Sequence, residues 1–347
     1  MCIRDRGIAT KFFTCTLSVM YREKTKQGEI FGGPMYVIKN GLPKRMLPLA
    51  YFFALAGMIG CLPAFQSNQL IQITGDLAFS EIENFNILGG LVLAGITGLV
   101  VIGGLKRIAE VATFLVPLMG SIYFGAMIVA LMLNLNLVLP AFKLIFVDAF
   151  NGTAIAGGTF FGVLIYGVRR GAFSNEAGMG TESLVHGVAK VSNPVKQGLV
   201  AMTGPIFDTL IICTATALMI LVSGVWETSS SQGVTLTAEA FSILLGNFGG
   251  LILFVCVICF GLSTIFTYSY YGASCSRFLF GKFGMKFYIY LYILSIFIYS
   301  IVPIDIAINI ADGAFAMMAI PTLISALWLA PKVMQASKNY FKLIDNN

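Results

Sequence analysis

The residues with the clearest chemical potential lie between Arg169 and Thr181, where the chain reads Arg-Arg-Gly-Ala-Phe-Ser-Asn-Glu-Ala-Gly-Met-Gly-Thr. This polar, glycine-punctuated segment follows Ala149–Val168, which contains no charged residue. Unpaired backbone groups are costly in lipid, so such a segment is tolerated only where protein buries it or where it lines a wet cavity. Broken helices of this kind form the binding sites of many secondary transporters. The pattern predicts a site for a small molecule or an ion within a membrane protein.

Gln66 is a second polar group inside an apolar stretch, in Gly60-Cys-Leu-Pro-Ala-Phe-Gln-Ser-Asn-Gln69. Its amide can both donate and accept, which matches the ammonium or the carboxylate of an amino acid. A hydrogen bond between two helices would satisfy it equally well, and both interpretations stay open. Pro63 removes a backbone donor and loosens the helix locally, which favours a cavity.

Several hydroxyl groups end a long charge-free run, in Ser263-Thr-Ile-Phe-Thr-Tyr-Ser-Tyr-Tyr-Gly272. At 3.6 residues per turn, Ser263 and Thr267 share one face of a helix, and Thr264 and Tyr268 share another. Adjacent hydroxyl oxygens that face a broken helix suit an alkali cation, which is a hard ion. The plainer alternative is that each hydroxyl donates to the carbonyl four residues earlier.

Asp208 is an acidic residue within an apolar stretch, where a charged side chain is unexpected. It lies twelve residues after Lys196, which is about 18 Å along a helix and so near the middle of a membrane. A carboxylate at that depth is expected to be paired or protonated. Arg169 or Arg170 is the natural partner, and a structural ion pair and a cation-coupling acid are both open. Asp312, near the start of the last apolar stretch, could also reach the interior.

Composition places these groups in a membrane protein. The mean hydropathy is +0.86, with 57% hydrophobic and 11% charged residues, whereas soluble domains average about 25% charged. Long continuous apolar runs indicate helices rather than the alternating strands of a barrel. We expect a single domain over residues 1–347 with eight full spans and one apolar fragment at Gly7–Tyr21. The spans are the broken run above and the windows Met46–Gly75, Asn84–Leu105, Val111–Phe142, Thr209–Trp226, Ala240–Ser276, Phe287–Ile304 and Gly313–Pro331.

Basic residues predict the orientation. At least sixteen lysines and arginines lie in alternate connecting segments and at the C-terminus, against Lys143 alone in the other segments. Because loops rich in lysine and arginine stay in the cytoplasm, we expect a cytoplasmic C-terminus and a bacterial-type inner membrane. The net charge of +6 then reflects insertion into the membrane and not nucleic-acid binding.

No enzyme signature is present. The sequence has no P-loop, HExxH or GxSxG motif, no paired carboxylates, and no Cys/His ligand set. We therefore expect neither an enzyme nor an organic cofactor.

The motifs together resemble the alanine or glycine:cation symporter family, also called the sodium:alanine symporters. The resemblance runs from Gly7 to about Lys332, and Phe-Ser-Asn-Glu-Ala-Gly is its most specific part. The other matching motifs are Gly32-Gly-Pro-Met-Tyr36, Pro194-Val-Lys-Gln-Gly198, Ser263-Thr-Ile with Tyr270-Tyr-Gly272, and Met318-Ala-Ile-Pro321.

The resemblance implies a LeuT-like bundle of two inverted repeats, with sodium and a small neutral amino acid, alanine or glycine, bound at the midplane. It assigns substrate contacts to Gln66, Phe173, Ser174, Asn175, Thr264 and Tyr268, and sodium contacts to Ser263, Thr264 and Thr267. It also implies that Gly7–Tyr21 is the tail of the second helix, that the first helix and most of the second are absent, and that residues 1–6 are foreign. Tyr268 stands where many members have tryptophan, which changes the pocket.

The leading hypothesis is sodium-coupled symport by alternating access in a lipid bilayer. One alternative is a proton-coupled amino-acid carrier in which Asp208 titrates. Another is a truncated chain that does not transport.

Overall fold

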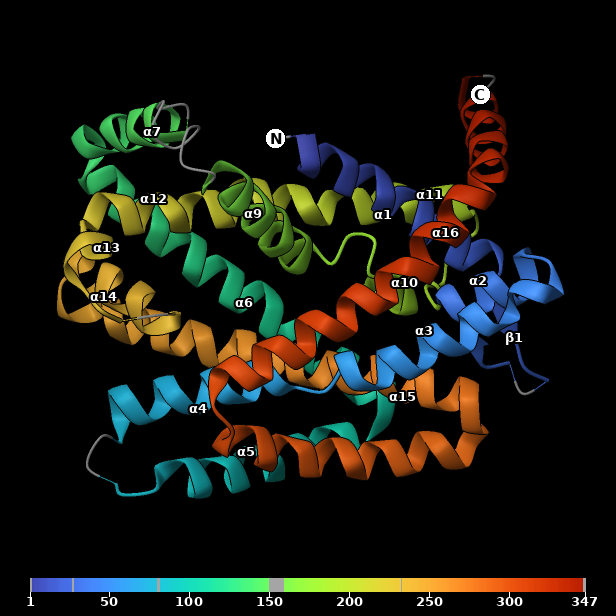
Figure 1. Ribbon diagram of the computed structural model, residues 1–347, viewed down its shortest axis with the longest axis horizontal. Helices are drawn as coiled ribbons and strands as arrows, with labels where there is room; N and C mark the ends of the chain where they lie inside the picture. Colours follow the sequence, from blue (N-terminus) through green and yellow to red (C-terminus); the bar gives the residue numbers. More distant parts are fainter. Residues whose placement is uncertain (1, 27, 80–81, 150–158, 232, 346–347) are drawn as a thin grey trace.

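The computed structural model describes residues 2–26, 28–79, 82–149, 159–231 and 233–345, and helices dominate them (Figure 1). Within these ranges the sheet structure is one short antiparallel hairpin, in which β1 (Glu23–Lys24) pairs with β2 (Ile30–Phe31). The all-α class predicted from the long apolar runs is confirmed.

The helices follow in two groups, separated by the undescribed residues 150–158. The first group is α1 (Cys2–Met20), α2 (Pro34–Gly41), the 3-10 helix η1 (Lys44–Met46), α3 (Leu47–Gly60), α4 (Ala64–Ala78), α5 (Phe85–Val101), α6 (Gly104–Leu133) and α7 (Leu135–Ala149). The second group is α9 (Thr159–Asn175), α10 (Thr181–His186), α11 (Pro194–Pro205), the π-helical η2 (Ile206–Cys213), α12 (Thr214–Ser223), α13 (Val225–Thr228), α14 (Val234–Leu245), α15 (Asn247–Ile301) and α16 (Ile304–Asp345).

Five stretches among the described residues are helical, long and apolar enough to cross a membrane: Lys44–Asp76, Gly104–Leu133, Pro194–Ser223, Phe248–Ile301 and Ile304–Ile344. The window at Asn84–Leu105 forms the shorter helix α5, whose large side chains Ile87, Leu91 and Leu99 are exposed. Contiguous exposed apolar surface of this kind fits contact with lipid rather than water. The fold is that of a polytopic helical membrane protein.

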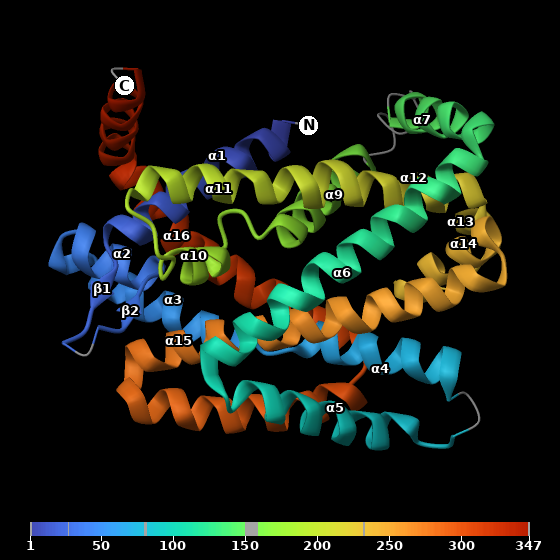
Figure 2. The ribbon, with the colours of Figure 1, turned by 180° about the vertical axis from the view of Figure 1, so that it is seen from behind.

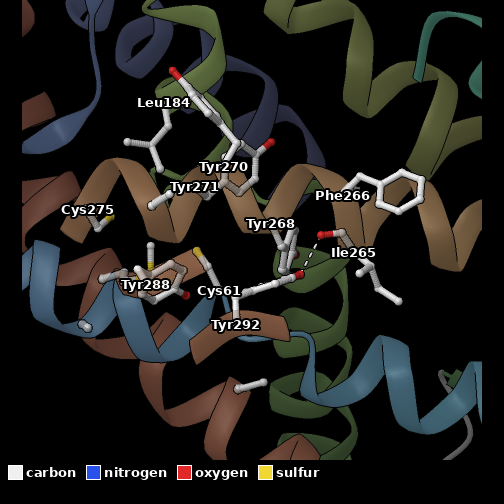
Figure 3. Close-up of a cluster of buried hydrophobic side chains, with 14 of the residues drawn as sticks. Cys61, Leu184, Ile265, Phe266, Tyr268, Tyr270, Tyr271, Cys275, Tyr288 and Tyr292 are labelled. Carbon is white, nitrogen blue, oxygen red and sulfur yellow. Dashed lines mark hydrogen bonds between the residues drawn. The ribbon is translucent and has the colours of Figure 1, made fainter. Parts of the chain in front are cut away.

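The expected span Ala240–Ser276 covers the end of α14 and most of the first half of α15, and the expected span Phe287–Ile304 lies mainly in the second half of α15. Gly281 has φ 70° and ψ −157°, a conformation that glycine adopts without the steric cost of a Cβ atom, and the chain turns back there (Figure 1). The second half is fixed by two tyrosines, shown in Figure 3. Tyr288 Oη donates to the Met58 carbonyl over 2.8 Å, and Tyr292 Oη donates to the Ile265 carbonyl over 2.6 Å.

Gly272 makes this close contact between the halves of α15 possible. A Cβ atom at Gly272 would lie 2.1 Å from Tyr288 Oη, which its hydrogen bond holds in place. We expect Gly272→Ala to destabilise the protein by about 1–3 kcal/mol, the usual cost of overpacking a core. Gly125→Ala in α6 is the control, because nothing lies within 4 Å of a Cβ atom there. Thermal unfolding of both variants checks the prediction, and equal midpoints would contradict it.

The helix α15 packs against α3, α4, α5, α6 and α14. α1 lies along α11, α16 lies along α3, and α6 crosses the molecule obliquely from α15 to α12 (Figures 1 and 2). One end of the molecule carries the β1–β2 hairpin, α2, η1 and the turn at Gly281. The opposite end carries α13, α14 and the C-terminal end of α4.

Candidate functional site

The helix break expected at the polar segment is present. α9 ends at Asn175 and α10 begins at Thr181. Between them, Glu176 has φ 53°, Gly178 φ 84° and Gly180 φ 89°. A positive φ at a non-glycine residue is strained and persists only where surrounding contacts enforce it. The glycines supply the other two left-handed positions, so the chain between α9 and α10 is not helical.

Two hydroxyl donors hold Glu176 in this strained position. Tyr268 Oη donates to Glu176 Oε1 over 2.8 Å, and Thr181 Oγ1 donates to Glu176 Oε2 over 2.7 Å. The Asn175 side chain supports the same turn, because its Oδ1 accepts from the Ala177 backbone N–H over 2.9 Å. The unwound segment is therefore connected through a carboxylate to α15, which carries Tyr268 (Figure 3).

A cavity of about 430 Å³ opens beside this carboxylate, between α4, the end of α9, the start of α14 and α15. It brings together four of the residues implied by the resemblance: Gln66, Ser174, Thr264 and Tyr268. Sequence reasoning missed Glu176, which is the one charged side chain among the described residues that line the cavity. The sequence contained a sign of this, because a carboxylate lies within the Phe-Ser-Asn-Glu-Ala-Gly motif.

Gln66 reaches the cavity because the helix containing it is broken. α3 ends at Gly60 and α4 begins at Ala64, with Pro63 between them. The local loosening expected from Pro63 is thus a complete interruption, and Gln66 lies in the first turn of α4. In the same turn, Ser67 Oγ donates to the Pro63 carbonyl four residues earlier.

Other predicted residues do not line this cavity. Asn175 is 4% exposed and lies beside α1, since a Cβ atom at Gly7 would be 3.2 Å from its Nδ2. Ser263 points toward α6, with its Oγ 3.8 Å from Met119 Sδ. Thr267 lines a separate cavity of about 350 Å³ with Ile108 and other residues. The Phe173 side chain falls outside the part of the chain that the structure describes.

The hydroxyls on α15 donate to carbonyls of their own helix, which is the alternative to cation binding described in the sequence analysis. Ser263 Oγ and Thr264 Oγ1 donate to the Phe260 carbonyl, each over 2.9 Å, and Thr267 Oγ1 donates to the Ser263 carbonyl over 2.8 Å. Donation of the proton leaves the lone pairs of each oxygen as potential cation ligands. Thr264 and Tyr268 line the cavity beside Glu176, whereas Thr267 lines the other one.

Asp208 lies next to the end of α9. Its Oδ2 accepts from Ser174 Oγ over 2.7 Å and from Thr209 Oγ1 over 3.2 Å. Asp208 is in η2, a π-helical segment that begins directly after Pro205. Short π-helical segments within α-helices are frequently found at functional sites.

The expected pairing of Asp208 with an arginine stays a prediction, because Arg170 is the one candidate whose side chain the structure describes. Arg170 Nη2 instead lies 3.1 Å from Asp312 Oδ2, in an ion pair that joins α9 to α16. The side chain of Arg169, the other proposed partner, is not among those described. Asp312 reaches the interior, as the sequence indicated, and Asp208 is held by hydroxyl donors.

Comparison with known proteins identifies the family. The model of the sodium:alanine symporter family matches residues 4–347. The sodium/alanine symporter AgcS of Methanococcus maripaludis is 35% identical over 350 residues, covering 98% of this chain and 76% of the relative. The uncharacterized transporter YflA of Bacillus subtilis is 38% identical over 346 residues, covering 96% and 72%. The probable sodium/glutamine symporter GlnT of Bacillus subtilis is 33% identical over 337 residues, covering 96% and 69%. The chain belongs to the sodium:alanine symporter family, and it is a membrane transporter rather than an enzyme.

Proposed function

We propose that the protein carries alanine or glycine across the membrane together with sodium, by alternating access. The observation that carries this proposal is the cavity at the unwound segment, where Glu176 faces Gln66 and Thr264 from two other helices. Discontinuous helices that place polar backbone and side chains around a central cavity are the usual binding sites of secondary transporters. A sodium gradient then drives uptake as the bundle rocks around the loaded site.

The lining of the cavity suits a zwitterionic amino acid. The carboxylate of Glu176 is positioned to accept hydrogen bonds from the substrate ammonium. The Gln66 amide is a donor for the substrate carboxylate, and the hydroxyl oxygens of Ser174 and Thr264, whose protons go to Asp208 and to the Phe260 carbonyl, are further acceptors for the ammonium. Phe173 and Asn175 complete the unwound stretch in this proposal, and Tyr268 fixes the orientation of Glu176.

Sodium would bind on α15, where Ser263, Thr264 and Thr267 contribute hydroxyl oxygens. Oxygen ligands suit a hard cation. Thr264 lines the substrate cavity, whereas Ser263 and Thr267 lie on the neighbouring face, so a cation bound between these faces would lie beside the substrate. This arrangement supports coupling, because sodium would order the part of α15 that carries Tyr268.

We further propose a LeuT-like bundle of inverted repeats in a bacterial-type inner membrane, with the C-terminus in the cytoplasm. The positive residues Lys24, Lys39, Arg277 and Lys282 lie together at the end of the molecule that holds the β1–β2 hairpin. Glu227 and Glu239 lie in α13 and α14 at the other end. This asymmetry follows the positive-inside rule.

Proton coupling through Asp208 is the alternative. The Asp208 carboxylate accepts hydrogen bonds from Ser174 and Thr209. We expect Asp208→Asn to reduce alanine uptake, because the amide accepts these bonds less strongly, but to leave the pH profile of uptake unchanged. Measuring uptake between pH 5.5 and 8.5 checks this (about 10³-fold in proton concentration, enough to titrate any coupling acid in that range). A flattened profile in the variant would favour proton coupling instead.

Uptake of labelled alanine tests the proposed function. The protein is expressed from the complete open reading frame that contains these residues, and uptake is measured in sodium and in potassium buffers. Concentrative uptake in sodium alone supports the proposal. Uptake that is equal in the two buffers, or no uptake, would overturn the coupling.

A further inference from the structure

A second large cavity lies away from the proposed transport site. It has a volume of about 400 Å³ and lies between the β1–β2 hairpin, α2, the start of α3 and the turn of α15 at Gly281. We call it the basic pocket, since its charged lining is Lys24, Lys39, Arg277, Lys282 and Glu23.

Positive charge exceeds negative charge in the basic pocket. Lys39 Nζ is 2.8 Å from Glu23 Oε1, and Arg277 Nη2 is 2.7 Å from Glu29 Oε2 at the rim. The hydrogen bond and charge of Arg277, with the charge of Lys282, lower the pKa of Glu29, so this carboxylate is ionised. Four cations thus face two carboxylates, which leaves an excess of two positive charges in one concave site.

The geometry of Arg277 shows that the pocket is built rather than a chance group of surface lysines. Its side chain is 12% exposed, and its guanidinium carbon lies 3.8 Å from the centre of the Phe31 ring. A cation over an aromatic face is held both by the ring and by the ion pair. Tyr36 and Tyr51 pack against Phe278 beside it, with ring centroids 5.3 and 5.7 Å away.

The wall of the basic pocket continues into an apolar surface. On α3, Tyr51, Leu55 and Ile59 follow one another at helical spacing and are 45%, 53% and 48% exposed. On the second half of α15, Phe283 and Phe287 are exposed as well. The two helices are in contact, since Tyr288 of α15 bonds Met58 of α3. A cationic pocket that opens onto exposed apolar side chains matches an amphiphile and not a free ion.

We propose that the basic pocket binds the phosphate-bearing headgroup of an anionic phospholipid, whose acyl chains lie along α3 and the second half of α15. Lys24 and Lys282 contact the phosphate, and Arg277 holds the aromatic wall of the pocket. Basic pockets between membrane helices bind such headgroups, and each nearby lysine adds affinity. The bound lipid would fasten the β1–β2 hairpin to the turn of α15, two segments that are distant in the sequence.

Lipid binding to the detergent-purified protein tests the proposal, with native mass spectrometry as the readout. Phosphatidylglycerol and phosphatidylcholine with identical acyl chains are titrated separately, and inorganic phosphate is a third arm. We expect phosphatidylglycerol to bind more tightly than phosphatidylcholine. The double variant Lys24→Gln/Lys282→Gln should weaken it by about 5-fold per lysine, or about 25-fold in all, without changing phosphatidylcholine binding.

The double variant Lys338→Gln/Lys342→Gln is the matched control, because both of its lysines are exposed on α16 outside the basic pocket. It should bind phosphatidylglycerol as the unchanged protein does. Equal affinity for the two lipids would overturn the proposal, and so would equal weakening by the two double variants. If inorganic phosphate at comparable concentration displaces phosphatidylglycerol completely, the site is an anion site and not a lipid site. All these variants change exposed residues, so each is expected to fold.

Discussion

Replacing Glu176 by glutamine is expected to weaken alanine binding by about 100-fold, or about 3 kcal/mol, within the range measured for removing one partner of a desolvated charge pair. Glu176 is the charged side chain that the structure places on the proposed substrate cavity, and its oxygens are fixed by Tyr268 and Thr181. The glutamine keeps the shape of the side chain and one hydrogen-bond acceptor, but it loses the charge that attracts the ammonium group.

The control for this prediction is Glu110→Gln. Glu110 lies in α6, 64% exposed, in a loose pair with Lys106, and its loss should leave alanine affinity unchanged. Affinity is measured from the alanine-dependent change in intrinsic fluorescence or by equilibrium binding at saturating sodium. If Glu176→Gln binds alanine as tightly as the unchanged protein while remaining folded, Glu176 does not hold the ammonium group.

Asp312→Asn is expected to destabilise the protein by about 2 kcal/mol, between the small value of exposed ion pairs and the 3–5 kcal/mol of fully buried ones. The side chains of Arg170 and Asp312 are 34% and 15% exposed, with 3.1 Å between Nη2 and Oδ2. The pair joins the helix before the unwound segment to α16, so breaking it should also lower the rate of transport.

A double-mutant cycle isolates the interaction energy between Arg170 and Asp312 from the effect of each single substitution. Asp312→Asn, Arg170→Gln and the combined variant are compared by thermal unfolding, and we expect a coupling energy of about 1–2 kcal/mol. The pair Lys106–Glu110, at 3.9 Å and with both partners largely exposed, is the matched control, with an expected coupling of about 0.5 kcal/mol or less. Equal coupling in the two cycles would show that the Arg170–Asp312 pair has no structural role.

The break in the helix could be predicted from the sequence because its cause is local. Glycines at positions 178 and 180 and a polar run within an apolar stretch specify an unwound segment wherever the rest of the chain lies. The faces of α15 were predictable for the same reason, since Ser263 and Thr267 follow the helical period. Which face points to the cavity depends on how α6 packs against α15, and no single segment contains that information.

The partner of Asp208 illustrates what could not be predicted. Charge complementarity alone selected an arginine, and two arginines lie near the break. Asp208 accepts a hydrogen bond from Ser174 of α9, and Asp312 from the distant helix α16 binds Arg170. Both effects are tertiary, so a pattern of charges along the chain cannot reveal them.

Coupling of sodium to a small neutral amino acid is tested most directly by letting an alanine gradient drive sodium, which is the reverse of sodium-driven alanine uptake. The protein is reconstituted into vesicles with equal sodium inside and outside, and alanine is added outside only. We expect radioactive sodium to accumulate inside above its starting level while the alanine gradient lasts, and we expect Glu176→Gln to reduce this accumulation greatly. Entry of alanine without any accompanying movement of sodium would contradict the coupling.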